Sequence, residues 1–189
     1  MTLSALDICS RALVQLGANP IASFNEETTE AHVAAQLYSL TMRTLLSSYP
    51  WRFALKQVAL ARLLTPPASD YRYAYALPAD CVRVLSAGSI GRGRGLNYRI
   101  AGGTLHTDEE TVMLTYITQP DEADFPAFFV SALTARLAAA FALPLTESTT
   151  RTDYLRKVAA EEVQTARLID SQQSVPSAFQ DFSLIEVRG

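Results

Sequence analysis

The order of sequence periodicities along the chain constrains the fold more than any other feature. Two stretches with helical spacing come first, a block with period-two alternation follows, and two more helical stretches come after it. We therefore expect an α+β fold. Residues 1–52 and 119–170 should pack together as a helical bundle, residues 53–118 should form an inserted, small and mostly antiparallel β lobe, and residues 171–189 should be an extended C-terminal segment.

The first two helices have recognisable starts. Ser4 and Asp7 have the spacing of a capping box, which predicts a helix at the start of the chain. Thr28 or Thr29 can cap a second helix, which should stop before Pro50 because the residue before a proline is pushed out of the helical region. The side chains expected on one face of this second helix are Val33, Leu37, Leu40 and Thr44.

The strand block is marked by alternation and by closely spaced turn residues. Tyr71, Tyr73 and Tyr75 alternate with small or charged residues, which is typical of a strand with one aromatic face. We interpret that face as core, with stacking on nucleic-acid bases as the alternative. An alanine and two glycines at residues 101–103 predict a hairpin turn. Further strands are expected near residues 55–62, 96–100, 104–107 and 111–117.

The helical period returns after residue 120. A strongly apolar stripe predicts a third helix that ends at Pro144, and its members are Phe129, Leu133, Leu137 and Phe141. Ser148 or Thr149 can cap a fourth helix. Its face is weakly apolar, so we expect this helix to need a partner. The residues of that face are Leu155, Ala159, Glu162, Ala166 and Ile169.

Composition and charge indicate a folded protein that does not bind nucleic acid or membranes tightly. The chain has 189 residues, of which 49% are hydrophobic, and a formal net charge of −3, so it has no overall positive field. Asp7 and Arg11 interrupt the first apolar stretch, which argues against a signal peptide, and we expect no apolar run long enough to span a bilayer. Cys9 and Cys81 lie far apart in sequence, as expected of structural thiols in a reducing compartment.

No pattern of catalytic or metal-ligating residues stands out in the sequence. His32 and His106 lack ligand-spaced neighbours, so we interpret both as surface residues and expect no metal and no cofactor. No nucleophile motif occurs, so we expect no catalytic residues. The three carboxylate pairs are interpreted as solvated, although any of them could contribute to an acid and base pair: Glu26 with Glu27, Glu109 with Glu110, and Glu161 with Glu162.

A glycine-rich segment is the one place where a phosphate contact is considered. Residues 88–99 hold several glycines, and Arg92 and Arg94 supply positive charge among them. The spacing matches neither of the common phosphate-binding patterns. We interpret the segment as a hairpin tip, with contact to a phosphate or to a protein partner through Arg92 and Arg94 as the alternative.

Four sequence pieces, in a fixed order and spacing, carry a resemblance to a known family. These pieces are LGANPIASF after the first helix, the junction of Pro50, Trp51 and Phe53, LPADCVRVL at residues 77–85, and DFPAFFVSALTARLAA at the start of the third helix. With them the chain resembles the head–tail adaptors, or connectors, of tailed bacteriophages, especially the tail tubular protein A type and the related adaptors of prophages and gene transfer agents. The resemblance covers almost the whole chain.

The resemblance implies a structural protein of the virion and no enzyme. Such adaptors assemble in the host cytoplasm into a homo-oligomeric ring, usually of twelve copies, at the head–tail junction, where the ring joins the portal protein to a tail or nozzle protein and double-stranded DNA passes through it. The helical part is implied to build the ring, the strand lobe to face the tail side or periphery, and the C-terminal extension to reach the portal. By this analogy the portal-docking side chains are Phe179, Phe182, Leu184, Ile185 and Val187.

Two other functions stay open at this point. One is a tail-associated polysaccharide or cell-wall hydrolase that uses a pair of the carboxylates. The other is a DNA-binding terminator or packaging accessory that uses Arg92 and Arg94. An adaptor should show neither hydrolase activity nor salt-dependent DNA affinity.

Overall fold

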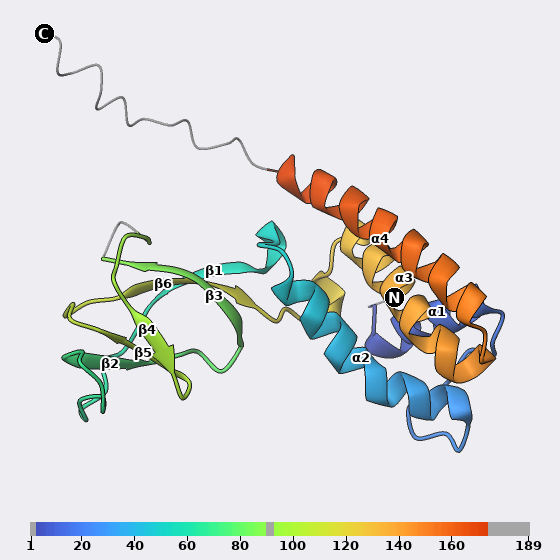
Figure 1. Cartoon of the computed structure of the whole chain (residues 1–189), viewed down its shortest axis with the longest axis horizontal. Coiled ribbons are helices and arrows are strands. Elements are labelled where there is room, and N and C mark those ends of the chain that lie inside the picture. The colour runs from blue at the N-terminus through green and yellow to red at the C-terminus, as the bar shows by residue number, and fades with distance from the viewer. Residues whose placement is uncertain (1–2, 90–92, 174–189) are drawn as a thin grey trace, which may run out of the picture.

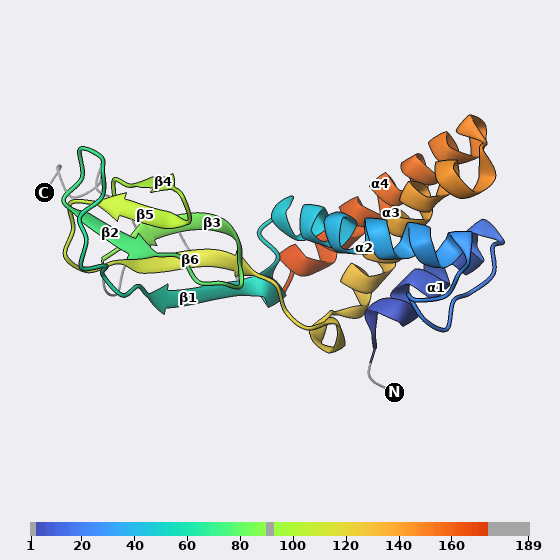
Figure 2. The same ribbon diagram turned by 90° about the horizontal axis from the view of Figure 1, so that it is seen from below.

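The computed structural model describes residues 3–89 and 93–173 and shows an α+β protein made of two bodies. Helices form one body and strands form the other, and Figures 1 and 2 show the two bodies side by side along the long axis of the molecule. The elements in chain order are α1 (Ala5–Leu16), α2 (Thr29–Ser47), η1 (Arg52–Ala54), β1 (Leu55–Ala59), β2 (Tyr73–Ala76), β3 (Cys81–Gly88), β4 (Arg99–Ala101), β5 (Thr104–Thr107), β6 (Met113–Thr118), η2 (Glu122–Asp124), α3 (Ala127–Thr146) and α4 (Thr149–Ser171).

The helix starts follow the local capping signals. Ser4 and Asp7 form the expected capping box, in which the Ser4 side chain accepts from the Asp7 backbone N–H and the Asp7 carboxylate accepts from the Ser4 N–H. Thr28 caps α2, and Ser148 caps α4. Helix α2 ends at Ser47, before Pro50. These predictions are confirmed because each depends on neighbouring residues alone.

Helix α3 is the centre of the bundle and packs against the other three helices. Its predicted stripe is confirmed, since Phe129, Leu133, Leu137 and Phe141 are all fully buried. The prediction that Pro144 ends the helix is wrong. Pro144 removes one backbone donor, but only two helical residues follow it, and Glu147 caps the end in the left-handed conformation.

By length and composition α3 could also cross a membrane, contrary to the expectation that no apolar run is long enough. The most apolar window of the helix is 61% buried inside the protein. Its place between the other three helices accounts for this composition.

The core-facing sides of α2 and α4 match the predicted ones only in part. Val33, Leu37 and Leu155 are partly buried against the core, as predicted. The buried residues of α2 are Ala31, Ala34, Tyr38, Met42, Leu45 and Leu46, whereas Leu40 is 65% exposed. The buried face lies about one residue further along the helix, because two alanines and a tyrosine face the core where larger aliphatic residues were expected. On α4, Ala159 and Ala166 are buried as predicted, but Glu162 and Ile169 are exposed and Val163 is buried instead.

The β lobe contains two three-stranded antiparallel sheets, with strand orders β1-β6-β3 and β2-β5-β4. The expected small, mostly antiparallel lobe is therefore confirmed, but its strands are divided between two sheets. The two sheets share a core that includes Tyr75, Leu105, Leu114 and Tyr116, which come from both of them. Tyr75 is buried, so the core interpretation of the tyrosine face is confirmed there. The predicted hairpin joins β4 to β5 through two glycines with positive φ.

Candidate interaction surfaces

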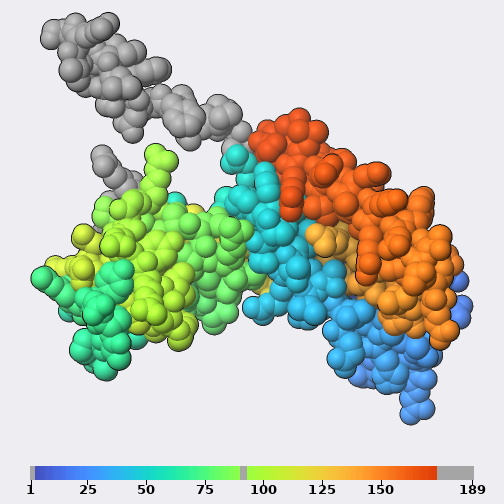
Figure 3. All heavy atoms as spheres, viewed as in Figure 1, coloured from blue at the N-terminus to red at the C-terminus, as the bar shows by residue number. Residues whose placement is uncertain are grey.

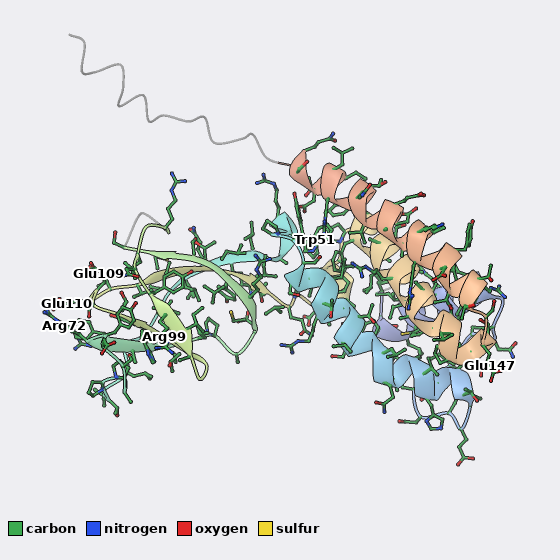
Figure 4. The ribbon with its side chains drawn as sticks, viewed as in Figure 1. Trp51, Arg72, Arg99, Glu109, Glu110 and Glu147 are labelled. Carbon is green, nitrogen blue, oxygen red and sulfur yellow. The ribbon has the colours of Figure 1, made fainter. Side chains whose placement is uncertain are left out.

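Aromatic packing and hydrogen bonds join the two bodies where they meet, in a region that we call the junction and define as residues 47–54 and 119–126. Both chain crossings between bundle and lobe pass through it. Trp51 is fully buried at its centre and packs edge-on against Tyr49 and Phe129, with ring centroids 5.0 and 5.2 Å away. The indole N–H donates to the Leu45 carbonyl oxygen at 2.9 Å. The junction is therefore a packed aromatic core that belongs to both bodies (Figure 4).

The lobe also holds the end of α2 directly. An Arg83 guanidinium N–H from β3 donates to the Ser47 carbonyl oxygen at 2.7 Å. Ser47 is the last residue of α2, where carbonyl groups lack helical partners and carry partial negative charge. A cation from the lobe thus caps a helix of the bundle.

Asp80, at the start of β3, ties the lobe strands together close to the junction. Its carboxylate accepts from the Thr118 hydroxyl at 2.7 Å, the Lys56 ammonium at 3.0 Å and the Tyr116 hydroxyl at 3.1 Å. These three side chains come from β1 and β6. The hydrogen bond from Thr118 is the main cause that holds the pKa of Asp80 below its ordinary value.

The end of the lobe farthest from the bundle carries an exposed apolar loop tip, which we define as residues 60–72 (Figure 3). Leu64 is fully exposed there and Leu63 is partly exposed. The base of the loop is fixed, because the Leu63 N–H donates to the Ala74 carbonyl oxygen and the Arg62 guanidinium lies 4.9 Å from the Tyr73 ring centroid. Leu64 is therefore an exposed apolar side chain on a fixed loop, which a protein partner could contact.

The glycine-rich segment lies only partly within the described residues. Arg92 falls outside them, and Arg94 is exposed. Gly93 is held against the β1-β6-β3 sheet, since its carbonyl oxygen accepts from Ser86 at 2.7 Å and from Thr115 at 3.4 Å. Arg94 is therefore an exposed side chain next to an anchored glycine.

The predicted portal-docking residues Phe179, Phe182, Leu184, Ile185 and Val187 all lie outside the described residues. The described chain reaches Gln173, just beyond the end of α4. The last turn of α4 lies against the junction. The segment 174–189 therefore follows directly from the part of α4 that lies against the junction.

The candidate catalytic and metal-binding residues do not converge. His106 is buried, contrary to the expectation of a surface histidine, and its two ring nitrogens lie 3.0 Å from the Ser69 hydroxyl and 2.8 Å from the Thr104 hydroxyl. His32 is exposed on α2. Among the described residues no group of three potential metal ligands occurs. Cys9 and Cys81 are both free, and burial raises the pKa of the Cys9 thiol to about 12.

The three carboxylate pairs lie in three different parts of the molecule. Glu26 lies in the loop before α2, where it accepts hydrogen bonds from two backbone N–H groups of that loop. Glu109 and Glu110 lie at the far end of the lobe (Figure 4). Glu161 and Glu162 are exposed on α4. The Glu26 contacts are those of a loop-stabilising side chain.

A shallow cavity of about 580 Å³ lies between α1 and the first half of α3. Arg11 and Gln15 line it from α1, and Val130 and Thr134 line it from α3. Sequence reasoning did not predict this cavity, because its lining residues come from two helices that are separated by the whole lobe.

Comparison with protein-family models gives no match for this chain, and comparison with curated proteins gives no significant match.

Proposed function

We propose that this chain is a structural head–tail adaptor of a tailed phage or phage-like particle, in which copies form a ring that joins the portal to the tail and lets DNA pass. The observation that carries the proposal is the two-body architecture, in which packed aromatic residues and hydrogen bonds join the bundle to the lobe. A bundle made from both halves of the chain and an inserted lobe offer separate surfaces along one axis. Such a layout suits a component that contacts a different partner at each end.

The outer face of α4 supports contact with neighbouring copies. Tyr154 and Leu168 are exposed on this helix although they are large apolar residues. They are fourteen positions apart, which places them on the same side of the helix. In a ring, this side would be covered by the next subunit, while the buried residues of the helix pack against α3 of the same chain.

The apolar loop tip supports a contact at the opposite end of the molecule. Leu64 at this tip would bind the tail or nozzle protein, and the bundle would lie nearer the portal. The formal net charge of −3 fits a channel through which DNA passes without being held, because phosphates are repelled from acidic walls.

The C-terminal extension is proposed to dock on the portal protein. The test is a pull-down of purified portal protein with the full chain and with a variant that ends at residue 173. We expect the full chain to be retained and the truncated chain to be lost, with identical circular dichroism spectra for both. Leu64→Ser, at the far end of the lobe, is the matched control and should still be retained. Retention of the truncated chain would contradict this assignment.

The hydrolase alternative is separated from the adaptor by a direct assay. Zymography of the purified chain on cell-wall and capsular polysaccharide should show no clearing. Clearing that is lost on changing a single glutamate of one pair to glutamine would replace the adaptor proposal with a hydrolase. A DNA-binding accessory would instead show salt-dependent affinity for double-stranded DNA that falls when Arg92 and Arg94 both become alanine.

A further inference from the structure

The last turn of α4 contacts the segment 48–52, through which the chain leaves the bundle and enters the lobe. Both carboxylate oxygens of Asp170 lie 3.1 Å from the backbone nitrogen of Arg52, which donates one N–H to them. Asp170 is fully buried. These two residues are 118 positions apart in the chain, so the contact joins the end of one body to the start of the path into the other.

A second side chain of the same turn holds the same crossing. The Arg167 guanidinium lies 5.4 Å from the centroid of the Tyr49 ring and donates to the Ser48 hydroxyl at 3.2 Å. Arg167 and Asp170 are one helical turn apart, so they present their side chains to the same side of α4. Together they hold residues 48–52 from one side, while Arg83 of the lobe holds the preceding residue, Ser47, from another.

A buried carboxylate in this place needs an explanation. Burial raises the pKa of Asp170, although the hydrogen bond from Arg52 and its positive charge act in the opposite direction. No salt bridge to Asp170 occurs among the described residues. Burying a charge for a single backbone donor is a poor way to gain stability. The arrangement does fix the position of one backbone amide relative to the end of α4.

We propose that the last turn of α4 is a latch that sets the orientation of the β lobe on the helical bundle. The latched crossing passes through η1 directly into β1, so its position determines where the first lobe strand begins. The segment 174–189 follows the same turn. If that segment docks on a portal protein, as in the proposed function on which this last step rests, the latch links docking to the position of the lobe.

The test uses nuclear magnetic resonance of the full free chain. In the wild type, amide residual dipolar couplings of α3 and of β5 and β6 should fit one alignment tensor. In Asp170→Ala, the Arg52 amide should exchange with solvent about tenfold faster or more. The residual dipolar couplings of the lobe should then no longer fit the alignment tensor of the bundle. They should fit a separate tensor of smaller magnitude, because the lobe reorients relative to the bundle. The matched control is Asp153→Ala, which removes an exposed aspartate from the same helix and should leave both readouts unchanged.

Unchanged exchange at Arg52 together with a single shared tensor in Asp170→Ala would overturn the proposal. If that variant does not fold, Arg167→Met decides, since it removes the contacts with Tyr49 and Ser48 and leaves the carboxylate in place. It should speed amide exchange across residues 48–52 by about threefold or more and reduce the lobe tensor. No change in either readout would again overturn the latch. The experiment needs no portal protein, so its failure and the failure of the portal pull-down are distinguishable.

Discussion

Replacing Trp51 with phenylalanine tests whether the junction is a structural core shared by both bodies. The substitution removes the indole N–H, so the Leu45 carbonyl oxygen loses one of its donors and keeps the Ser48 hydroxyl and backbone N–H, at a cost of about 1 kcal/mol. The smaller ring also gives up contacts with Tyr49 and Phe129 and leaves a small void, which costs about 1 to 2 kcal/mol more. We therefore expect the free energy of unfolding to fall by about 2 to 3 kcal/mol.

The assay is urea unfolding followed by far-ultraviolet circular dichroism, with thermal unfolding as a second measure. For a chain of this size the expected loss corresponds to a fall in Tm of about 4 to 12 °C. Leu40→Ala is the control, since Leu40 is exposed on α2 and its replacement should change stability by less than about 0.5 kcal/mol. A loss of under about 1 kcal/mol in Trp51→Phe would refute the reasoning that the junction is tightly packed. Trp51 is the single tryptophan, so its fluorescence in the wild type reports on the junction alone.

Three further predictions concern the lobe. Asp80 has a lowered pKa in the folded protein, so its contribution to stability is present above the ordinary value of 3.8 and is lost as the pH falls through the folded value. Asp80→Asn should therefore be less stable than the wild type by about 1 kcal/mol at neutral pH, with a gap that closes in urea titrations below about pH 4. Gly93→Ala would place a methyl group 2.7 Å from the Gln57 amide nitrogen, so the hydrogen bond of Gln57 to Thr115 should break; chemical denaturation should show a loss of about 1 kcal/mol, and an unchanged midpoint would argue against the anchored loop. Leu64→Ser should leave Tm unchanged but weaken binding to the tail-side partner in a titration, and undiminished affinity would remove the loop tip from that interface.

The sequence predicted those features that depend on neighbours in the chain. The capping box at Ser4, the cap at Ser148 and the glycine hairpin between β4 and β5 each involve residues within a few positions of one another. The apolar stripe of α3 was also readable, because this helix is surrounded by the other three. Local signals and a strong helical period were sufficient for the α+β class and for the order of the elements.

Features that depend on distant parts of the chain were not predictable in the same way. Alternation marks a strand but does not choose its partner, so the division into two sheets was missed. The face of α2 was misplaced because Ala31 and Ala34 are small, and their burial depends on how closely α3 approaches. The burial of His106 was not predictable, because its hydroxyl partner Ser69 lies 37 positions earlier in the chain.

The junction shows the same limit most clearly. Trp51 was noticed as part of a sequence resemblance, but its aromatic neighbour Phe129 comes from the other half of the chain. Asp170 has no distinguishing feature in the sequence, although it is buried and binds the Arg52 amide. A buried polar residue at the end of a polar helix has no periodic signature. Such contacts become visible only when the two halves of the chain are placed together.

Single-particle electron microscopy of the purified chain mixed with portal protein tests the central claim most directly. The adaptor proposal predicts a ring of this chain stacked coaxially on the portal, with an open channel, the bundles toward the portal and the lobes pointing away from it. Particles that show the portal alone, with the chain remaining free at saturating concentration, would contradict the proposal.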